Sequence, residues 1–391
     1  MLMLVSRVNF SVIILKIMGN FIDYIAKKFD SEDVIKFSEK DSFSEVKSWC
    51  DTGSPLLNYN IHTLGFPTGI IEIAGKSKSG KTSLGLMTMK SFLKEHKNNG
   101  VCVILSSENR DNKDYALQLG IDVNSVLIIR VRYVEKMFLQ TKKIITEADQ
   151  YFAEKKIKPY YFFLWDSLGA TLSKSELDTM DENLDTMSKK LEKGSDISDL
   201  KHEKVGAFAK SAKMFCKYIT SEMYNHPIHF VILNHQYDVI GSMVPGARKS
   251  TGGEFIELMP CMRFSLKVKA NEKVDDAEVS QITEVKPIKN DFGSRKKTEI
   301  RILFGYGVIL SEGEIQYAIE RGILKKVGAR KITFMDGKMS WCSLKEFFNL
   351  YYNHNKYLPI LYAKIKKSFD NDLLDMKKKL NDIDDEEEDE E

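Results

Sequence analysis

The stretch that decides the fold is Gly75-Lys76-Ser77-Lys78-Ser79-Gly80-Lys81-Thr82, which fits the pattern G-x-x-x-x-G-K-[ST] without a mismatch. The apolar run at 70–74 predicts a buried strand before it, and the apolar spacing from Ser83 to Met89 predicts a helix after it. In that context, loop N–H groups and the positive helix end bind phosphates, Lys81 adds a full charge, and Thr82 presents a hydroxyl to Mg²⁺. The sequence therefore predicts a nucleoside triphosphate site at 75–83.

Size and composition set the class of protein. The chain has 391 residues, 43% of them apolar and 29% charged, which suits one main globular domain with smaller appendages. Its five cysteines are odd in number and never at C-x-x-C spacing, which favours a reducing compartment, here the cytoplasm, over disulfides or a zinc cluster. The apolar start at 1–17 is broken by charged residues and too short to span a bilayer, so we expect no membrane partner.

The net charge of +2 is the sum of a basic body and an acidic C-terminus. Nine of the last ten residues are carboxylates, and without them the chain has 58 basic and 47 acidic residues, or +11. A basic body with an acidic tail suggests a polyanion ligand with which the tail competes. A disordered end that only aids solubility is the alternative.

From Gly53 onward, apolar strands alternate with helical stretches. Most of the strands close on polar residues, which predicts an α/β fold with a mostly parallel, doubly wound sheet and a ligand crevice at the strand ends. We expect strands at 70–74, 101–105, 126–131, 160–165 and 229–233, helices at 137–156 and 205–224, and antiparallel strands at 265–269 and 300–304. Two long loops, 173–204 and 237–253, interrupt this pattern.

Four regions follow from this reading. We expect an N-terminal extension at 1–52, with a helix at 21–29 and a β-like run at 33–37. The ATPase-like core would span 53–308, a small C-terminal α/β domain 309–369, and an acidic disordered tail 370–391.

Several polar residues at predicted strand ends can carry chemistry. Asp166 follows the apolar run 160–165, and a carboxylate there can hold Mg²⁺ opposite Thr82. Glu108 ends the strand after the P-loop helix and can activate a water molecule. His235, after Asn234, can sense the γ-phosphate and pass the signal to the loop that follows. Tyr115 can stack on the base or can be a core residue, and spacing does not separate the two.

In this order and spacing, these motifs resemble the RecA-type recombinases, particularly the UvsX-like recombinases of large tailed phages. The resemblance covers residues 53–348 and includes the segment Tyr115–Asp122, Thr251-Gly252-Gly253 and Phe304-Gly305-Tyr306-Gly307. The pair Asn234-His235, where the bacterial proteins have Asn-Gln, favours the phage branch.

The resemblance implies a RecA-like P-loop ATPase core and a helical filament on single-stranded DNA. ATP would lie between protomers, the N-terminal region would be a polymerisation arm, and the two long loops would line the DNA path. It implies that Lys81, Glu108, His235 and Lys289 are catalytic, that Thr82 and Asp166 hold Mg²⁺, and that Tyr115 and Phe304 contact the base. For DNA contact we expect Arg248, Lys249, Gly252 and Gly253, where glycines allow close backbone approach. The family has a lysine pair where this chain has Lys289-Asn290-Asp291, so only the first position matches.

The predicted function is ATP-dependent pairing and strand exchange between single-stranded and double-stranded DNA. We expect DNA-dependent hydrolysis of ATP with Mg²⁺, self-association, and single-strand-binding and loader proteins as partners. A hexameric helicase with the same core is one alternative, although little chain precedes Gly53 to form its usual extra N-terminal domain. A recombination mediator that exchanges no strands is the other.

Overall fold

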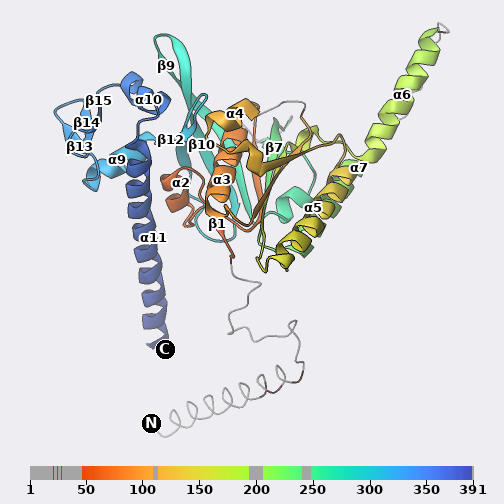
Figure 1. Cartoon of the computed structure of the whole chain (residues 1–391), viewed down its shortest axis with the longest axis horizontal. Helices are drawn as coiled ribbons and strands as arrows, with labels where there is room; N and C mark the ends of the chain where they lie inside the picture. The colour runs from red at the N-terminus through yellow and green to blue at the C-terminus, as the bar shows by residue number, and fades with distance from the viewer. Residues whose placement is uncertain are drawn as a thin grey trace. The chain divides into compact units, whose positions relative to one another are not determined.

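The computed structural model describes Phe21, Tyr24, Lys28 and residues 46–108, 113–192, 206–239 and 248–389, with side chains up to Lys379 (Figure 1). The chain divides into two compact units, Met1–Lys47 and Ser48–Glu391. Phe21, Tyr24 and Lys28 of the first unit are helical, as expected at 21–29. The β-like run predicted at 33–37 and the segment 1–17 lie outside the described residues.

The second unit is built on one large sheet. Its strand order is β12-β11-β10-β9-β3-β7-β6-β4-β5, and the strands from β9 to β5 run parallel while β10, β11 and β12 are antiparallel. This confirms the predicted α/β fold with a mostly parallel central sheet. The strands are β3 (Gly69–Gly75), β4 (Gly100–Ser106), β5 (Val126–Arg130), β6 (Tyr160–Asp166), β7 (Ile228–Asp238), β9 (Met262–Val274), β10 (Ala277–Asn290), β11 (Thr298–Leu303) and β12 (Gly307–Ile309).

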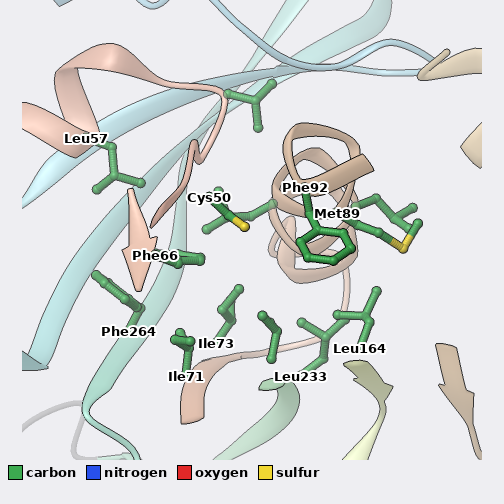
Figure 2. Packing of buried hydrophobic residues seen from close by; sticks show 14 of the residues in the cluster. Cys50, Leu57, Phe66, Ile71, Ile73, Met89, Phe92, Leu164, Leu233 and Phe264 are labelled. Carbon is green, nitrogen blue, oxygen red and sulfur yellow. The ribbon is translucent and has the colours of Figure 1, made fainter. Parts of the chain in front are cut away.

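Helices cover the central parallel strands on both faces, and alternation along each strand explains why the strands are apolar throughout. Ile71 and Ile73 of β3 pack with Met89 and Phe92 of α3 (Figure 2). Ile70, the residue just before Ile71, belongs to a second cluster on the other face. The helices of this region are α2 (Pro55–Asn60), α3 (Lys81–Glu95), α4 (Lys113–Gln118), α5 (Val134–Glu154), α6 (Lys174–Glu192), α7 (Ala207–Glu222) and α8 (Phe255–Leu258).

The C-terminal part of the chain has an apolar cluster of its own. Trp341, Phe347 and Ile365 pack there, and residues of β11 and β12 join them. Buried Glu314 ties this region to the start of the core, because it accepts hydrogen bonds from the Ser54 hydroxyl (2.7 Å) and the Leu56 N–H (3.1 Å). The elements are α9 (Glu312–Glu320), β13 (Lys325–Val327), β14 (Lys331–Phe334), β15 (Met339–Trp341), α10 (Leu344–Tyr352) and α11 (Leu358–Asp389).

Three expectations need correction. The core begins before Gly53, because β1 (Trp49–Cys50) pairs with β2 (Phe66–Pro67) and Cys50 is fully buried. The segment predicted as a long loop from Ser173 is helical over α6, and the end of that segment, 193–204, lies outside the described residues. Apolar residues recur every three or four positions along α6 and mark one helical face: Leu177, Met180, Leu184, Met187 and Leu191.

The boundary placed at residue 370 is also wrong. Helix α11 continues through it without a break, and Leu373 is buried against the body of the protein. Asp372 accepts a hydrogen bond from the Tyr317 hydroxyl (2.7 Å) and pairs with Arg321. The first turns of the predicted tail are therefore folded. In the described part of the chain, no helix is long and apolar enough to cross a membrane.

A chain of buried polar groups lies at the amino-terminal edge of the sheet. His229 Nδ1 lies 2.9 Å from the Pro67 carbonyl oxygen, so Nδ1 carries the proton and Nε2 accepts from the Ser48 hydroxyl at 3.2 Å. His96 Nε2 lies 3.2 Å from the same hydroxyl. Burial lowers the pKa of His229 to about 3 and lowers that of His96. Both rings are therefore neutral in the folded protein at neutral pH.

This arrangement predicts acid sensitivity. The unfolded chain takes up protons below pH ~6.5 whereas folded His229 does not, so the free energy of unfolding should fall by about 1.4 kcal/mol per pH unit as the pH drops from 6.5 toward 4. Urea unfolding at a series of pH values measures this slope. Replacing His229 with Gln should flatten the slope, while replacing exposed His354 with Asn should leave it unchanged. Equal slopes in both variants would contradict the assignment.

Candidate active site

The P-loop connects β3 to α3 and has the backbone geometry that phosphate binding requires. Gly80, the residue before α3, has φ of 92°, and a Cβ there would collide with Ile302 of β11. Gly75 lies so close to β9 that a Cβ would be 2.8 Å from the Leu266 carbonyl oxygen. No side chain caps the N-terminus of α3, so its first N–H groups point toward a ligand position.

Lys81, the first residue of α3, is buried at the centre of the site. Its Nζ donates to the carbonyl oxygens of Gly75 (3.0 Å) and Lys76 (2.9 Å). Burial lowers the Lys81 pKa, while the charges of Asp166 and Glu108 oppose that shift. The ammonium group therefore faces two carboxylates and is held by loop carbonyls, which a triphosphate can replace as partners.

Asp166 ends β6 and is 9% exposed. Its strand lies between β4 and β7, with Asp166 paired to Ser106 on one side and Leu233 on the other. Mg²⁺ in nucleotide sites needs only one or two protein carboxylates beside substrate phosphates and water. Asp166 and the Thr82 hydroxyl fit that donor set. No cluster of three or more acidic, His or Cys residues suited to a metal occurs in the described parts of the chain.

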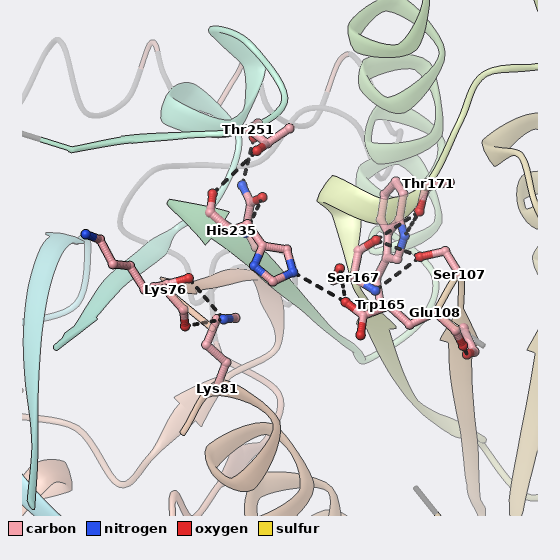
Figure 3. A network of polar contacts seen from close by, with 12 residues as sticks. Lys76, Lys81, Ser107, Glu108, Trp165, Ser167, Thr171, His235 and Thr251 are labelled. Atoms are coloured by element: carbon pink, nitrogen blue, oxygen red, sulfur yellow. Dashed lines mark hydrogen bonds and ion pairs between the residues drawn. The ribbon is translucent and has the colours of Figure 1, made fainter. Parts of the chain in front are cut away.

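Glu108 is joined to two neighbouring strands (Figure 3). Its Oε1 accepts a hydrogen bond from the Ser167 hydroxyl (2.8 Å) and lies 3.3 Å from His235 Nε2. Ser167 is fixed in turn, because its N–H donates to the Ser107 hydroxyl (3.2 Å), which donates to the Ser167 carbonyl oxygen (2.7 Å). The structure thus brings together Glu108, His235 and Asp166, whose partners Ser107 and Ser167 the sequence analysis did not single out.

The end of β7 is anchored by a buried amide. Asn234 donates through Nδ2 to Glu72 Oε1 (2.8 Å) and to the Thr251 carbonyl oxygen (2.7 Å). Glu72 also pairs with Arg263 of β9 (2.7 Å). The Thr251 N–H donates to the His235 carbonyl oxygen (3.2 Å). Backbone and side-chain bonds therefore connect His235 directly to the far end of the second loop.

The expected DNA residues lie at that far end. Strand β8 (Arg248–Ser250) pairs antiparallel with the last residues of β7, and the tip, 240–247, lies outside the described residues. Lys249 is exposed, and Arg248 Nε lies 3.6 Å from Asp238 Oδ1. Gly252 and Gly253 both have positive φ, 115° and 77°, which favours glycine.

The two residues expected at the base lie on adjoining elements. Tyr115 of α4 shares a hydrogen bond with Ser83 of α3 (2.7 Å between hydroxyl oxygens). Phe304, 39% exposed, follows β11, and the next residue, Gly305, approaches Gln118 at the end of α4. Tyr115 also packs against the hydrophobic core, so its contact with a base stays a prediction.

Lys289 is bonded to residues of its own chain. Its Nζ donates to the Leu258 carbonyl oxygen (3.0 Å) and lies 3.3 Å from Asp291. Asn290 is buried and donates to the carbonyl oxygens of Ile61 (3.0 Å) and Ser294 (2.7 Å). The second position of the family's lysine pair is thus a structural amide here.

A cavity of about 240 Å³ borders the site. Ser106, Glu108 and Asp166 line its rim, and Lys113 and Arg130 add positive charge. Most of the other lining residues are apolar and come from α3, β4, α4, β5 and the segment between α4 and β5. Both carboxylates of the site are therefore in contact with this cavity.

Comparison with known proteins agrees with this geometry. Residues 16–149 match the family described as the RecA N-terminal domain. Protein RecA of Chlorobaculum parvum is 26% identical over 318 residues, covering 81% of this chain and 82% of its own length. Protein RecA of Bacteroides thetaiotaomicron is 25% identical over 319 residues, with 81% and 86% covered, and that of Lactococcus lactis subsp. cremoris is 23% identical over 320 residues, with 80% and 74% covered.

The P-loop sequence, the mostly parallel sheet and the carboxylates at its edge are consistent with the class of P-loop proteins that have a RecA-like core. Over the matched regions the chain is therefore similar to the RecA proteins.

Two substitutions in the site should impair ATP binding and hydrolysis to different degrees. Replacing Lys81 with Ala removes the charge on the β- and γ-phosphates, so ATP binding and hydrolysis should both collapse. Replacing Glu108 with Gln should keep ATP binding and slow hydrolysis by roughly 10²-fold or more, the scale of a lost general base. Equilibrium binding of a fluorescent ATP analogue and steady-state phosphate release separate the two effects. Equal loss of binding in both variants would make Glu108 a structural residue.

Proposed function

We propose that this protein is an ATP-dependent homologous recombination protein that forms a helical filament on single-stranded DNA and catalyses pairing and strand exchange. One observation carries the proposal. The residue beside the candidate general base, His235, is bonded through its backbone to Thr251 at the base of the glycine-rich loop. A change at the γ-phosphate can therefore be transmitted to a basic loop without an intermediate domain.

In the proposed hydrolysis, Glu108 accepts the proton of the attacking water as its oxygen bonds to the γ-phosphorus. The bond from that phosphorus to the β–γ bridging oxygen breaks, giving ADP and phosphate. Ser167 and His235 orient the Glu108 carboxylate through their contacts with Oε1. Mg²⁺, held by Thr82 and Asp166, would neutralise charge on the β- and γ-phosphates. Lys81 leaves the Gly75 and Lys76 carbonyls for the phosphates.

The charges of the two long segments favour the second loop as the one that contacts DNA. Arg248 and Lys249 lie on β8 next to glycines whose backbone can approach a phosphate chain closely. Helix α6, in the first-loop position, carries three basic side chains against six acidic ones, a net charge of −3. Phosphates are repelled by that helix, so we assign the DNA path to the second loop.

The finer assignments rest on the sequence resemblance. We propose the cytoplasm as the site of action, ATP binding between protomers, and single-strand-binding and loader proteins as partners. We also propose kinship with the UvsX-like phage recombinases, which the pair Asn234-His235 supports. The residues that precede β1 would serve as the polymerisation arm and the end of the chain as an acidic competitor for DNA.

A mediator that binds ATP without exchanging strands is a second candidate, favoured by one observation. Lys289 is bonded to Leu258 and Asp291 of its own chain, and its neighbour is a buried asparagine. The Lys289 ammonium group could therefore reach the γ-phosphate at the next protomer only after these contacts had broken.

Electron microscopy with single-stranded DNA, Mg²⁺ and a non-hydrolysable ATP analogue tests the proposed function. We expect long helical filaments and, with ATP, strand exchange between a circular single strand and a homologous linear duplex. Closed rings would instead indicate a helicase. Discrete particles with ATP bound but no exchange would indicate a mediator.

A second test concerns the DNA loop. Replacing Arg248 and Lys249 with Ala should weaken single-stranded DNA binding and reduce its salt dependence, since each lost phosphate contact lowers the slope of log K against log[salt] by about 0.7. Fluorescence anisotropy of a labelled oligonucleotide across a salt series measures the slope. ATP hydrolysis without DNA serves as the control and should barely change. An unaltered slope would place the DNA path elsewhere.

A further inference from the structure

A side chain of the P-loop contacts a side chain of the second loop. Neither residue belongs to the set proposed as catalytic. Lys76 Nζ, on the P-loop, donates to Asp238 Oδ2 at 2.6 Å. Asp238 is the last residue of β7, next to the tip of the second loop. An ion pair thus spans the two elements expected to bind nucleotide and DNA.

The same carboxylate contacts the other side of the loop. Asp238 lies opposite Arg248 in the β7–β8 pairing, and its Oδ1 is 3.6 Å from Arg248 Nε. These neighbouring cations, Lys76 foremost, lower the pKa of Asp238 and keep it ionised. One carboxylate therefore offsets charge on a P-loop lysine and on a DNA-binding candidate.

Lys76 is also in contact with the catalytic lysine through its backbone. Its carbonyl oxygen accepts from Lys81 Nζ at 2.9 Å. When Lys81 turns to phosphates, this peptide loses a charged partner and is free to shift, and the Lys76 side chain shifts with it. The chain of contacts then runs from Lys81 through Lys76 and Asp238 to Arg248.

We propose that Lys76 and Asp238 are positioning residues that hold the base of the second loop in its nucleotide-free arrangement and release it when a triphosphate binds. The inference rests on the proposed function, because it takes the P-loop as the triphosphate site and β8 as part of the DNA path. It adds a second route between the two sites, separate from Glu108, His235 and Thr251.

The expected size of the effect follows from exposure. The side chains of Lys76 and Asp238 are 51% and 59% exposed, so the pair is partly screened and weak. A contact of this kind changes an equilibrium by about two- to five-fold. The effect should shrink as salt is raised through the physiological range.

Amide hydrogen exchange of the full chain, with and without a slowly hydrolysed ATP analogue and Mg²⁺, tests the proposal. In the natural protein, the analogue should raise exchange of peptides covering 236–239 and 248–250 by about two- to five-fold. Asp238→Asn should show the raised rate without analogue and little further change. Lys76→Met should do the same, and the double variant should not exceed either single one.

Lys97→Met is the control, since it removes the same charge from an exposed position outside the phosphate site. It should keep the response to the analogue. A fluorescent ATP analogue checks that each variant is loaded, and Asp238→Asn, outside the P-loop, remains decisive if Lys76→Met binds poorly. The proposal is overturned if the natural protein shows no response, or if Asp238→Asn responds as the natural protein does.

Oligonucleotide anisotropy separates this outcome from that of the proposed function. If the exchange response depends on Asp238 but no DNA binds, the coupling stands and the DNA function fails. If DNA binds and Asp238→Asn leaves the gain from nucleotide unchanged, the coupling fails alone. Failure of the natural protein to bind the analogue overturns both.

Discussion

Parallel pairing of strands buried on both faces is the constraint on which the rest of the structure depends. Because β3, β4, β6 and β7 run in one direction, their carboxyl ends meet at one edge of the sheet. The register then determines which residues lie opposite each other, and it pairs Gly75 with His235 and Ser106 with Asp166. A slip of one residue would turn each apolar side chain to the other face, so the packing that buries the sheet also fixes the site.

The site itself is a cluster of charged side chains held by neutral hydrogen-bonding groups. Lys81 is buried, faces Asp166 and Glu108, and is held by two loop carbonyls. A triphosphate brings negative charge to a place where a cation and uncapped helix N–H groups already converge, so little reorganisation is required on binding. The polar anchors around it, Asn234 with Glu72 and Ser167 with Ser107, are bonded to their neighbours. They hold Glu108 and His235 at the ends of strands of the sheet.

Much of the fold could be predicted because buried parallel strands are continuous apolar runs. The observed β4 and β6 begin and end within about a residue of the predicted ranges. Strand β10 was not predicted, because it alternates in polarity and contains Pro287, which the structure places at a bulge in its pairing with β9. Helix α6 was taken for a loop because charged residues dominate its composition and its apolar face is narrow. The start of the core was placed too late because β1 is only two residues long.

What the sequence by itself determined is the chemistry that lies in one contiguous segment. A P-loop needs a strand, two glycines, a lysine and a helix start, all within fifteen residues, so local rules suffice to recognise it. Only the tertiary structure decided the contacts between distant segments. Glu108 and His235 are 127 residues apart, and Lys76 and Asp238 are 162 apart. Such pairs depend on strand order and register, which arise from packing over the whole sheet and leave no local pattern to read.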